Sequence, residues 1–237
     1  MHQSPPRDPG TTLLALYQRL FDHFGPQNWW PADSPFETAV GAILTQNTAW
    51  TNVEKAIANL RRADALSCEA LLKTPRKQLE EMIRPAGFFR QKSERLHLFC
   101  RHLRDHHDGN LERLLAAPTA VARLELLELK GVGPETADSI LLYGGNHASF
   151  VVDAYTRRLL QRLDLLPGRG TYDEIRTFFM RNLPVDAALF NEYHALIVIL
   201  CKDYCRKRNP RCQSCPLIGL CRYPESAHPL TEGKKRR

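Results

Sequence analysis

The 237-residue chain contains no apolar run long enough to span a membrane, and its start, MHQSPPRDPG, lacks the apolar core of a secretory signal. We therefore expect a soluble protein that has no membrane partner and works in a reducing cytosol. Disulfides rarely persist there, so the seven cysteines are expected to be free thiols or metal ligands. Internal repeats are also absent from residues 11–222, which excludes a repeat architecture.

The sequence has little that predicts β-structure, because its nearest approach to a strand, Val151-Val152, is too short. Apolar residues instead recur at helical spacing from Leu13 to Phe24 and stop at Gly25-Pro26. A second helix is expected to begin after Asp33-Ser34-Pro35. The sequence thus predicts an all-α fold, with further helices at Asn52–Arg61, Arg76–Ile83, Gln91–Leu103, Leu111–Leu115 and Ala120–Leu129.

Acidic residues are fewer than basic ones, with 26 Asp and Glu against 33 Lys and Arg, which gives a formal charge of +7. This balance favours polyanionic partners, although an ordinary basic surface would look similar. Residues 226–237 end in Lys234-Lys235-Arg236-Arg237 and are expected to be a disordered basic tail that adds non-specific attraction. A second basic cluster lies between cysteines and comprises Arg206, Lys207, Arg208 and Arg211.

Four cysteines near the C-terminus follow the pattern C-x6-C-x2-C-x5-C: Cys205, Cys212, Cys215 and Cys221. Thiolates this close together in a reducing compartment are typical of one metal centre. Zinc sites more often pair two C-x2-C knuckles, and only one such pair is present here. An iron–sulfur cluster held by four thiolates fits the spacing at least as well, so both readings stay open. A metal would hold the basic cluster in one shape and present it to a phosphate backbone.

The segment Leu129–Ala137 has the features of a helix–hairpin–helix. An apolar helix ends at the turn Gly131-Val132-Gly133, and Pro134 is suited to the first position of a new helix. Such a turn can bind a DNA phosphate through backbone N–H groups without reading the base sequence. A plain turn between two helices is the alternative.

Asp153 follows three apolar residues, which is an unusual place for a solvated carboxylate. It is suited to a partly buried helix N-cap. Either it only caps a helix, or it faces a bound nucleotide, stabilises positive charge on the sugar and orients a water molecule.

The Gly-Val-Gly hairpin, the Val-Asp pair and the cysteine pattern together resemble the endonuclease III family of helix–hairpin–helix DNA glycosylases over about residues 13–222. The resemblance implies two helical domains with a DNA-binding cleft between them. Residues 36–150 would form a six-helix domain with the hairpin, and residues 11–35 with 151–225 would form the cluster domain. It further implies a catalytic Asp153 and a 4Fe-4S cluster on Cys205, Cys212, Cys215 and Cys221.

Bifunctional members of that family carry a lysine two residues after the second hairpin glycine. Here Glu135 takes that place, and a carboxylate cannot form the imine that leads to strand cleavage. We therefore expect a monofunctional glycosylase that uses Asp153 and water. Lys130 is expected to contact a phosphate together with the hairpin residues Gly131, Val132 and Gly133, and so are Arg206 and Lys207.

Three further segments resemble the 3-methyladenine glycosylases of the bacterial type III branch: Asn28-Trp29-Trp30-Pro31, Thr45-Gln46-Asn47-Thr48 and Arg84–Lys92. The cluster cysteines set this chain apart from that branch. The likeness implies a base pocket of Trp29, Trp30 and Glu135, where a cationic methylated base gains about 0.5–2 kcal/mol from a cation–π contact. Gln46 would fill the gap left by the extruded base, and Phe88 would wedge the opposite strand. Alternatively, these side chains only pack the core or the helix surface.

Other conspicuous residues are given structural interpretations. Cys68, Cys100 and Cys201 are expected to be small buried residues or to lie on helix surfaces. His194 is expected to be a core histidine. The cluster His102, His106 and His107 is interpreted as a solvated loop that does not bind metal.

The predicted function is hydrolytic release of an alkylated purine from damaged duplex DNA, by a monomer in the bacterial cytoplasm that associates with the nucleoid. The first alternative is a bifunctional glycosylase and lyase that acts on oxidised pyrimidines, against which Glu135 argues. The second is a non-catalytic DNA-damage-binding iron–sulfur protein, which would have no need of a buried carboxylate at Asp153.

Overall fold

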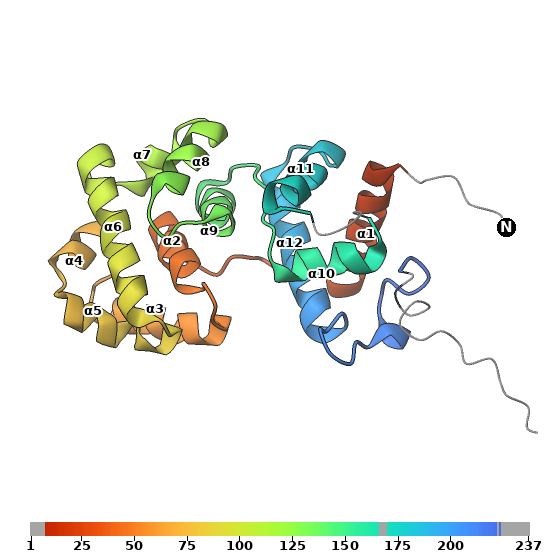
Figure 1. Ribbon diagram of the computed structural model, residues 1–237, viewed down its shortest axis with the longest axis horizontal. Coiled ribbons are helices and arrows are strands. Elements are labelled where there is room, and N and C mark those ends of the chain that lie inside the picture. Colours follow the sequence, from red (N-terminus) through yellow and green to blue (C-terminus); the bar gives the residue numbers. More distant parts are fainter. Residues whose placement is uncertain (1–7, 166–169, 222, 224–237) are drawn as a thin grey trace, which may run out of the picture. The chain divides into compact units, whose positions relative to one another are not determined.

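The computed structural model describes residues 8–165, 170–221 and 223 and is all-α, as expected (Figure 1). The one extended pairing among these residues is an isolated bridge between Ile218 and Cys221. No helix in the described ranges combines the length and the apolar character that crossing a membrane requires. The expected basic tail at residues 226–237 lies outside the described residues.

The chain divides into two compact units, of which one comprises Trp29–Val151 and the other Met1–Asn28 with Val152–Arg237. The first boundary precedes the one expected at residues 35 and 36. Trp30 explains the difference, because its ring packs on Trp50 and Tyr143 within the same unit.

Helix α2 is the central helix of the unit Trp29–Val151 and is buried on all sides from Glu37 to Leu44. Ser34 caps it by accepting a 3.1 Å hydrogen bond from the Glu37 amide, and Pro35 takes its first turn, which confirms the start signal in the sequence. The helices of this unit are α2 (Pro35–Leu44), α3 (Trp50–Arg62), α4 (Cys68–Lys73), α5 (Arg76–Met82), α6 (Phe89–His107), α7 (Leu111–Leu115), α8 (Thr119–Glu128) and α9 (Pro134–Ser139). A 3-10 turn at Arg84–Ala86 precedes α6, and a π-helical turn at Ile140–Gly144 follows α9.

The second unit is built from α1 (Pro9–Phe24), α10 (Ala154–Leu163), α11 (Tyr172–Asn182) and α12 (Ala187–Asp203). Helix α12 packs against both α1 and α10. Helix α1 ends at Phe24, and Gly25 follows it with a φ of 68°. The cysteine-containing segment continues from the C-terminal end of α12.

The interpretation of His102, His106 and His107 as a solvated loop is wrong. Helix α6 extends one turn beyond its expected end and includes all three histidines. The left-handed residues Asp108 (φ 53°) and Gly109 (φ 77°) end it. The expectation for the lone cysteines is confirmed, since Cys68, Cys100 and Cys201 are buried.

Candidate active site

Asp153 is the N-cap of α10, as its position in the sequence predicted. Its Oδ1 accepts hydrogen bonds from the amide of Thr156 at 2.7 Å and from the Thr156 hydroxyl at 3.0 Å. The side chain is 15 % exposed, so it is mostly enclosed but keeps some accessible surface.

His194 on α12 is the partner of Asp153 that sequence reasoning missed. Its Nε2 lies 3.6 Å from Asp153 Oδ2. Burial alone would raise the pKa of Asp153, but His194 and the Thr156 donors outweigh it, so this pKa lies below its ordinary value. The carboxylate is therefore ionised at neutral pH. Because 41 positions of sequence separate the two residues, no local signal could have found the pair.

The hairpin of the other unit has the predicted form. Helix α8 ends at Glu128, and Gly133 is the N-cap of α9 with Pro134 in its first turn. Gly131 has a φ of 90°, and a Cβ there would lie 2.4 Å from the Arg95 side chain. The positive φ favours glycine at this position, and a Cβ would also require the Arg95 side chain to move.

A buried ion pair joins the two helices of the hairpin. Arg123 on α8 donates to Asp138 on α9 through Nε (2.9 Å) and Nη2 (3.1 Å). Asp138 is fully buried and also accepts a 2.5 Å hydrogen bond from the Ser149 hydroxyl. This ion pair fixes the angle between α8 and α9, the helices before and after the hairpin turn.

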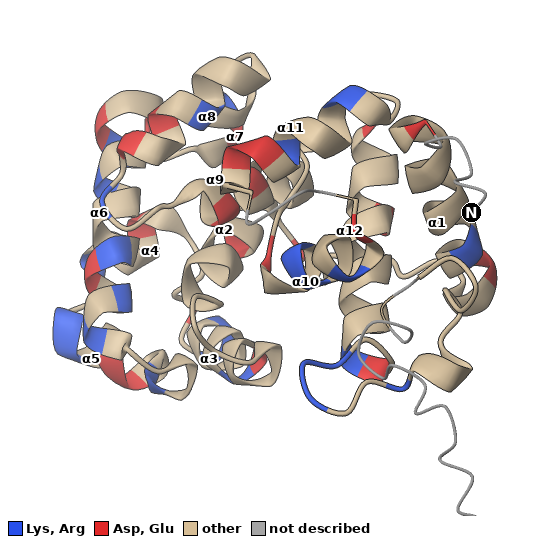
Figure 2. Cartoon of the chain, turned by 45° about the vertical axis from the view of Figure 1, so that its right-hand side comes forward, with Lys and Arg blue, Asp and Glu red and all other residues tan. Residues whose placement is uncertain are grey.

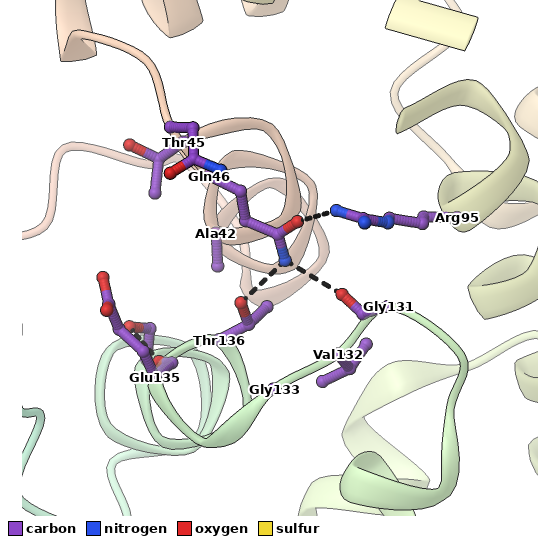
Figure 3. Close-up of a pocket in the computed structure, with 11 residues that line it drawn as sticks. Ala42, Thr45, Gln46, Arg95, Gly131, Val132, Gly133, Glu135 and Thr136 are labelled. Atoms are coloured by element: carbon purple, nitrogen blue, oxygen red, sulfur yellow. Dashed lines mark hydrogen bonds between the residues drawn. The ribbon is translucent and has the colours of Figure 1, made fainter. Parts of the chain in front are cut away.

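A pocket of about 600 Å³ lies beside the hairpin, and Gln46, Glu135 and the hairpin residues line it (Figure 3). Gln46 Nε2 donates to Gly131 O at 3.0 Å and to Thr136 Oγ1 at 2.9 Å, while its Oε1 accepts from Arg95. The structure thus brings together the segment Thr45–Thr48 and the hairpin, which are far apart in the sequence. Trp29 and Trp30 are not among the lining residues of this pocket.

Phe88 is 63 % exposed and has a φ of 46°, in the left-handed region that is costly for an aromatic residue. A solvent-exposed ring on strained backbone contributes nothing to a core, which is consistent with a ring that inserts into a partner. Beneath it, the buried Lys92 donates from Nζ to Leu44 O and to Ala86 O, both at 2.8 Å. One ammonium group therefore fixes the end of α2, where Gln46 follows, and the turn that carries Phe88.

The two expected pocket tryptophans belong to an aromatic cluster. The Trp30 ring stacks on Tyr143 with centroids 5.0 Å apart and an interplanar angle of 22°. Trp50 meets Trp30 edge-on at 4.7 Å, and Trp29 does so at 5.9 Å. Lys130, expected to contact phosphate, is exposed and pairs with Glu94 at 3.0 Å.

The cysteine-containing segment begins directly after α12, and lysines and arginines gather there, as Figure 2 shows. Arg162 on α10 donates from Nη1 to Cys205 Sγ at 3.1 Å, and Cys221 Sγ donates to Arg162 O at 3.5 Å. A hydrogen bond with Cys201, and then Arg162, lower the pKa of Cys205 to about 6. A guanidinium beside a thiolate is a favourable environment for a metal-binding cysteine. Lys207 is exposed, and Arg206 donates to Lys202 O at 3.2 Å.

The four cysteines provide a ligand set that fits an iron–sulfur centre by its chemistry, because four thiolates are its usual ligands. Burial raises the pKa of Cys215 to about 11, and the negative charges of Cys205, Cys221 and Cys212 add to the rise. A bound cation would favour the thiolate forms of these side chains. Among the described residues, no set of three ligand atoms within 4.8 Å of one another includes any of these cysteines.

The described residues thus combine an all-α scaffold, a helix–hairpin–helix and a helix-capping carboxylate. Residues 40–185 match the family model of the HhH-GPD superfamily base excision DNA repair protein, and the chain belongs to this superfamily. A candidate DNA repair glycosylase of Methanocaldococcus jannaschii is 47 % identical over 211 residues, which are 88 % of this chain and 95 % of that protein.

Two solved structures are similar to the chain. An endonuclease III–DNA complex superposes with a TM-score of 0.80 at 22 % identity, covering 93 % of this chain and 98 % of the other. The Helicobacter pylori 3-methyladenine DNA glycosylase MagIII bound to 1,N6-ethenoadenine gives a TM-score of 0.70 at 29 % identity, covering 82 % and 97 %. The protein is therefore a DNA N-glycosylase of base excision repair, of the HhH-GPD superfamily.

Proposed function

We propose that this glycosylase is monofunctional and hydrolyses the N-glycosidic bond of alkylated purines of the 3-methyladenine type in duplex DNA. The observation that carries the proposal is Glu135. Its side chain lines the pocket beside the hairpin, at the position where a Schiff-base mechanism requires an amine. Because a carboxylate cannot form the imine, hydrolysis of the N-glycosidic bond by water is the available route.

Asp153 supplies the catalytic group of that route. The bond between C1′ and the base nitrogen breaks, and its electron pair leaves with the base. The ionised carboxylate stabilises the positive charge that develops on the sugar, orients a water molecule toward C1′ and accepts its proton. His194 and Thr156 support the role, because they keep this carboxylate ionised.

Methylated purines suit a site with one carboxylate. 3-Methyladenine and 7-methylguanine carry positive charge while attached to the sugar, so they depart readily without a strong general acid. Aromatic faces attract such a cation, and Glu135, which lines the pocket beside the hairpin, would add a negative charge. Trp29 and Trp30 remain the proposed aromatic residues, although they do not line that pocket and the Trp30 ring already stacks on Tyr143. The 29 % identity with a 3-methyladenine DNA glycosylase supports the same substrate class.

Binding to the duplex is assigned to the hairpin residues Gly131, Val132 and Gly133, which would contact phosphate through the backbone. Lys130, Arg206 and Lys207 would add electrostatic attraction that weakens as salt rises. Gln46 and Phe88 would occupy the space left by the extruded nucleotide. The exposed, strained Phe88 supports that role. The protein would act on damaged duplex DNA as a monomer.

The four cysteines, Cys205, Cys212, Cys215 and Cys221, would hold a 4Fe-4S cluster. The mutual proximity of their sulfurs and the Arg162 contact support this. When bound, the cluster supplies cross-links that hold the basic segment in one shape. Purified protein should be brown, absorb broadly near ~400 nm and contain iron. Colourless protein that contains zinc would contradict the assignment, as would a Cys212→Ser variant that stays folded and binds DNA normally.

The test of the function is identification by mass spectrometry of bases released from methylated duplex DNA, with strand breaks scored in the same reaction. We expect free methylated purine and intact strands. Asp153→Asn should lower the rate at least ~100-fold. Asp164→Asn, at the exposed opposite end of α10, is the matched control and should leave the rate unchanged. Release of thymine glycol with accompanying nicks, and no release of methylated purines, would overturn the proposal.

A further inference from the structure

Three potential metal ligands lie close together within the unit Trp29–Val151. They are remote in sequence from the four C-terminal cysteines, Cys205, Cys212, Cys215 and Cys221. His102 and His107 lie on the last turns of α6, and Glu125 lies on α8. His102 Nε2 is 2.6 Å from Glu125 Oε1, and His107 Nε2 contacts the same oxygen. All three ligand atoms lie within 4.8 Å of one another.

The core of the unit holds these side chains in place. Leu103 on α6 and Leu126 on α8 are each next to a member of the trio, and both are fully buried. The trio itself is partly enclosed, with exposed fractions of 17 %, 16 % and 23 % for His102, His107 and Glu125. The site is therefore preformed, yet open to an ion and to one or more water molecules.

Both imidazoles direct Nε2 at one carboxylate oxygen, so the three ligand atoms already point at a common position. Without a metal, each Nε2 can donate a proton to that oxygen. A divalent cation could replace these hydrogen bonds, because it accepts both imidazole lone pairs and the carboxylate oxygen at once. Two histidines and a carboxylate, completed by water, form an established zinc ligand set.

We propose that His102, His107 and Glu125 bind a divalent cation of the zinc class through His Nε2 and Glu Oε1. Magnesium and calcium are disfavoured, since they take oxygen ligands, whereas imidazole suits zinc and its neighbours in the first transition row. Around zinc the donors lie about 3.3 Å apart, so the 2.6 Å separation has to open by less than about 1 Å. Side-chain rotation alone achieves this.

The ion would brace the helix that leads into the hairpin. Glu125 lies one turn before the end of α8, and the chain passes from there through Leu129 to Gly131. A bond from this helix to α6 would restrict the movement of α8 when the hairpin takes up a phosphate. The inference does not depend on which base the enzyme releases.

The test counts zinc and iron per chain in full-length protein after incubation with zinc and removal of the excess. Both metals are counted because the four cysteines are the other zinc-binding group, and they are the same in every variant. Wild-type protein should hold about one zinc ion more than Glu125→Gln or His102→Ala. His106→Ala is the matched control, because the exposed His106 ring lies 4.6 Å from the His102 ring, at an angle of 38°, but His106 is not a member of the trio.

Added zinc should also raise the melting temperature of wild-type protein and of His106→Ala, and leave that of Glu125→Gln unchanged. Glutamine keeps the shape and one acceptor oxygen, and circular dichroism without zinc verifies that each variant is folded. Equal zinc content in wild type and Glu125→Gln would overturn the proposal. The proposal would also be overturned if His106→Ala lost as much bound zinc as His102→Ala, because that would reveal non-specific zinc binding to surface histidines.

Discussion

Substitution of Asp138 by asparagine tests whether the hairpin depends on its buried ion pair. Asp138 has no exposed surface and accepts hydrogen bonds from Arg123 and Ser149. The change keeps the shape of the side chain but leaves the Arg123 guanidinium, itself only 15 % exposed, facing a neutral amide. Breaking a buried pair from one side typically costs about 3–5 kcal/mol of folding free energy.

The cost should appear directly in thermal unfolding followed by far-UV circular dichroism. Each kcal/mol lowers the melting temperature by roughly 2–8 °C for domains in this size range. We therefore expect Asp138→Asn to melt at least about 6 °C below wild type. Because the pair joins α8 to α9, affinity for undamaged duplex DNA should fall as well.

Asp105→Asn provides the matched control. Asp105 pairs with Arg104 at 2.8 Å, but the two side chains are 51 % and 57 % exposed. Water and salt screen such a pair, so its loss should not shift the melting temperature measurably. If Asp138→Asn melts no lower than Asp105→Asn, the buried pair does not stabilise the hairpin and the reasoning fails.

Three further predictions follow from single side chains. The pKa of Asp153 lies below its ordinary value. The rate of base release should therefore not decline through protonation of this carboxylate as the pH falls from 7 to about 5. A fall in the rate with a midpoint near pH 6, absent from Asp153→Asn, would contradict this. Burial lowers the pKa of Lys92 to about 8, and the unfolded chain therefore binds more protons between about pH 8 and 10.5. As the pH rises over that window, the free energy of unfolding of wild-type protein, measured in urea, should increase relative to that of Lys92→Met. If the difference between the two free energies stays constant, the prediction is refuted. Phe88→Ala should leave the melting temperature unchanged and slow base release from duplex DNA more than from single strands; equal slowing on both would exclude the wedge role.

Local chemistry explains the parts of this fold that could be predicted. Ser34-Pro35, Gly133-Pro134 and Asp153 each carry a cap or a first-turn signal, and each begins a helix as expected. The segment Thr45–Thr48, identified by resemblance, lies beside the hairpin in one pocket. These features depend on a few neighbouring residues or on a motif, so the sequence alone is sufficient.

Contacts between distant helices account for what could not be predicted. The short helix Cys68–Lys73 was missed, although its Ser67 cap gave a usable signal. The partner of Asp153, His194, lies on a different helix, and no pattern in the sequence links the two. The sequence predicts a helix that ends at Leu103, whereas α6 continues to His107. Glu125, which holds two histidines of α6, is 18 positions beyond the nearer one.

The buried charged residues of the unit Trp29–Val151 each connect segments that are separate in the sequence. Glu37, Lys92 and Asp138 are each less than a tenth exposed, and each bonds to a different segment of the chain. Apolar side chains of similar size would stabilise a core at least as well, but they would not fix the relative position of neighbouring helices as a hydrogen bond of defined geometry does. If Gln46 and Phe88 enter the base stack as proposed, they would need to be held to within about 0.5 Å. We therefore attribute the buried charges to positioning: Lys92 connects the end of α2 to the turn before Phe88, and Asp138 connects α9 to α8.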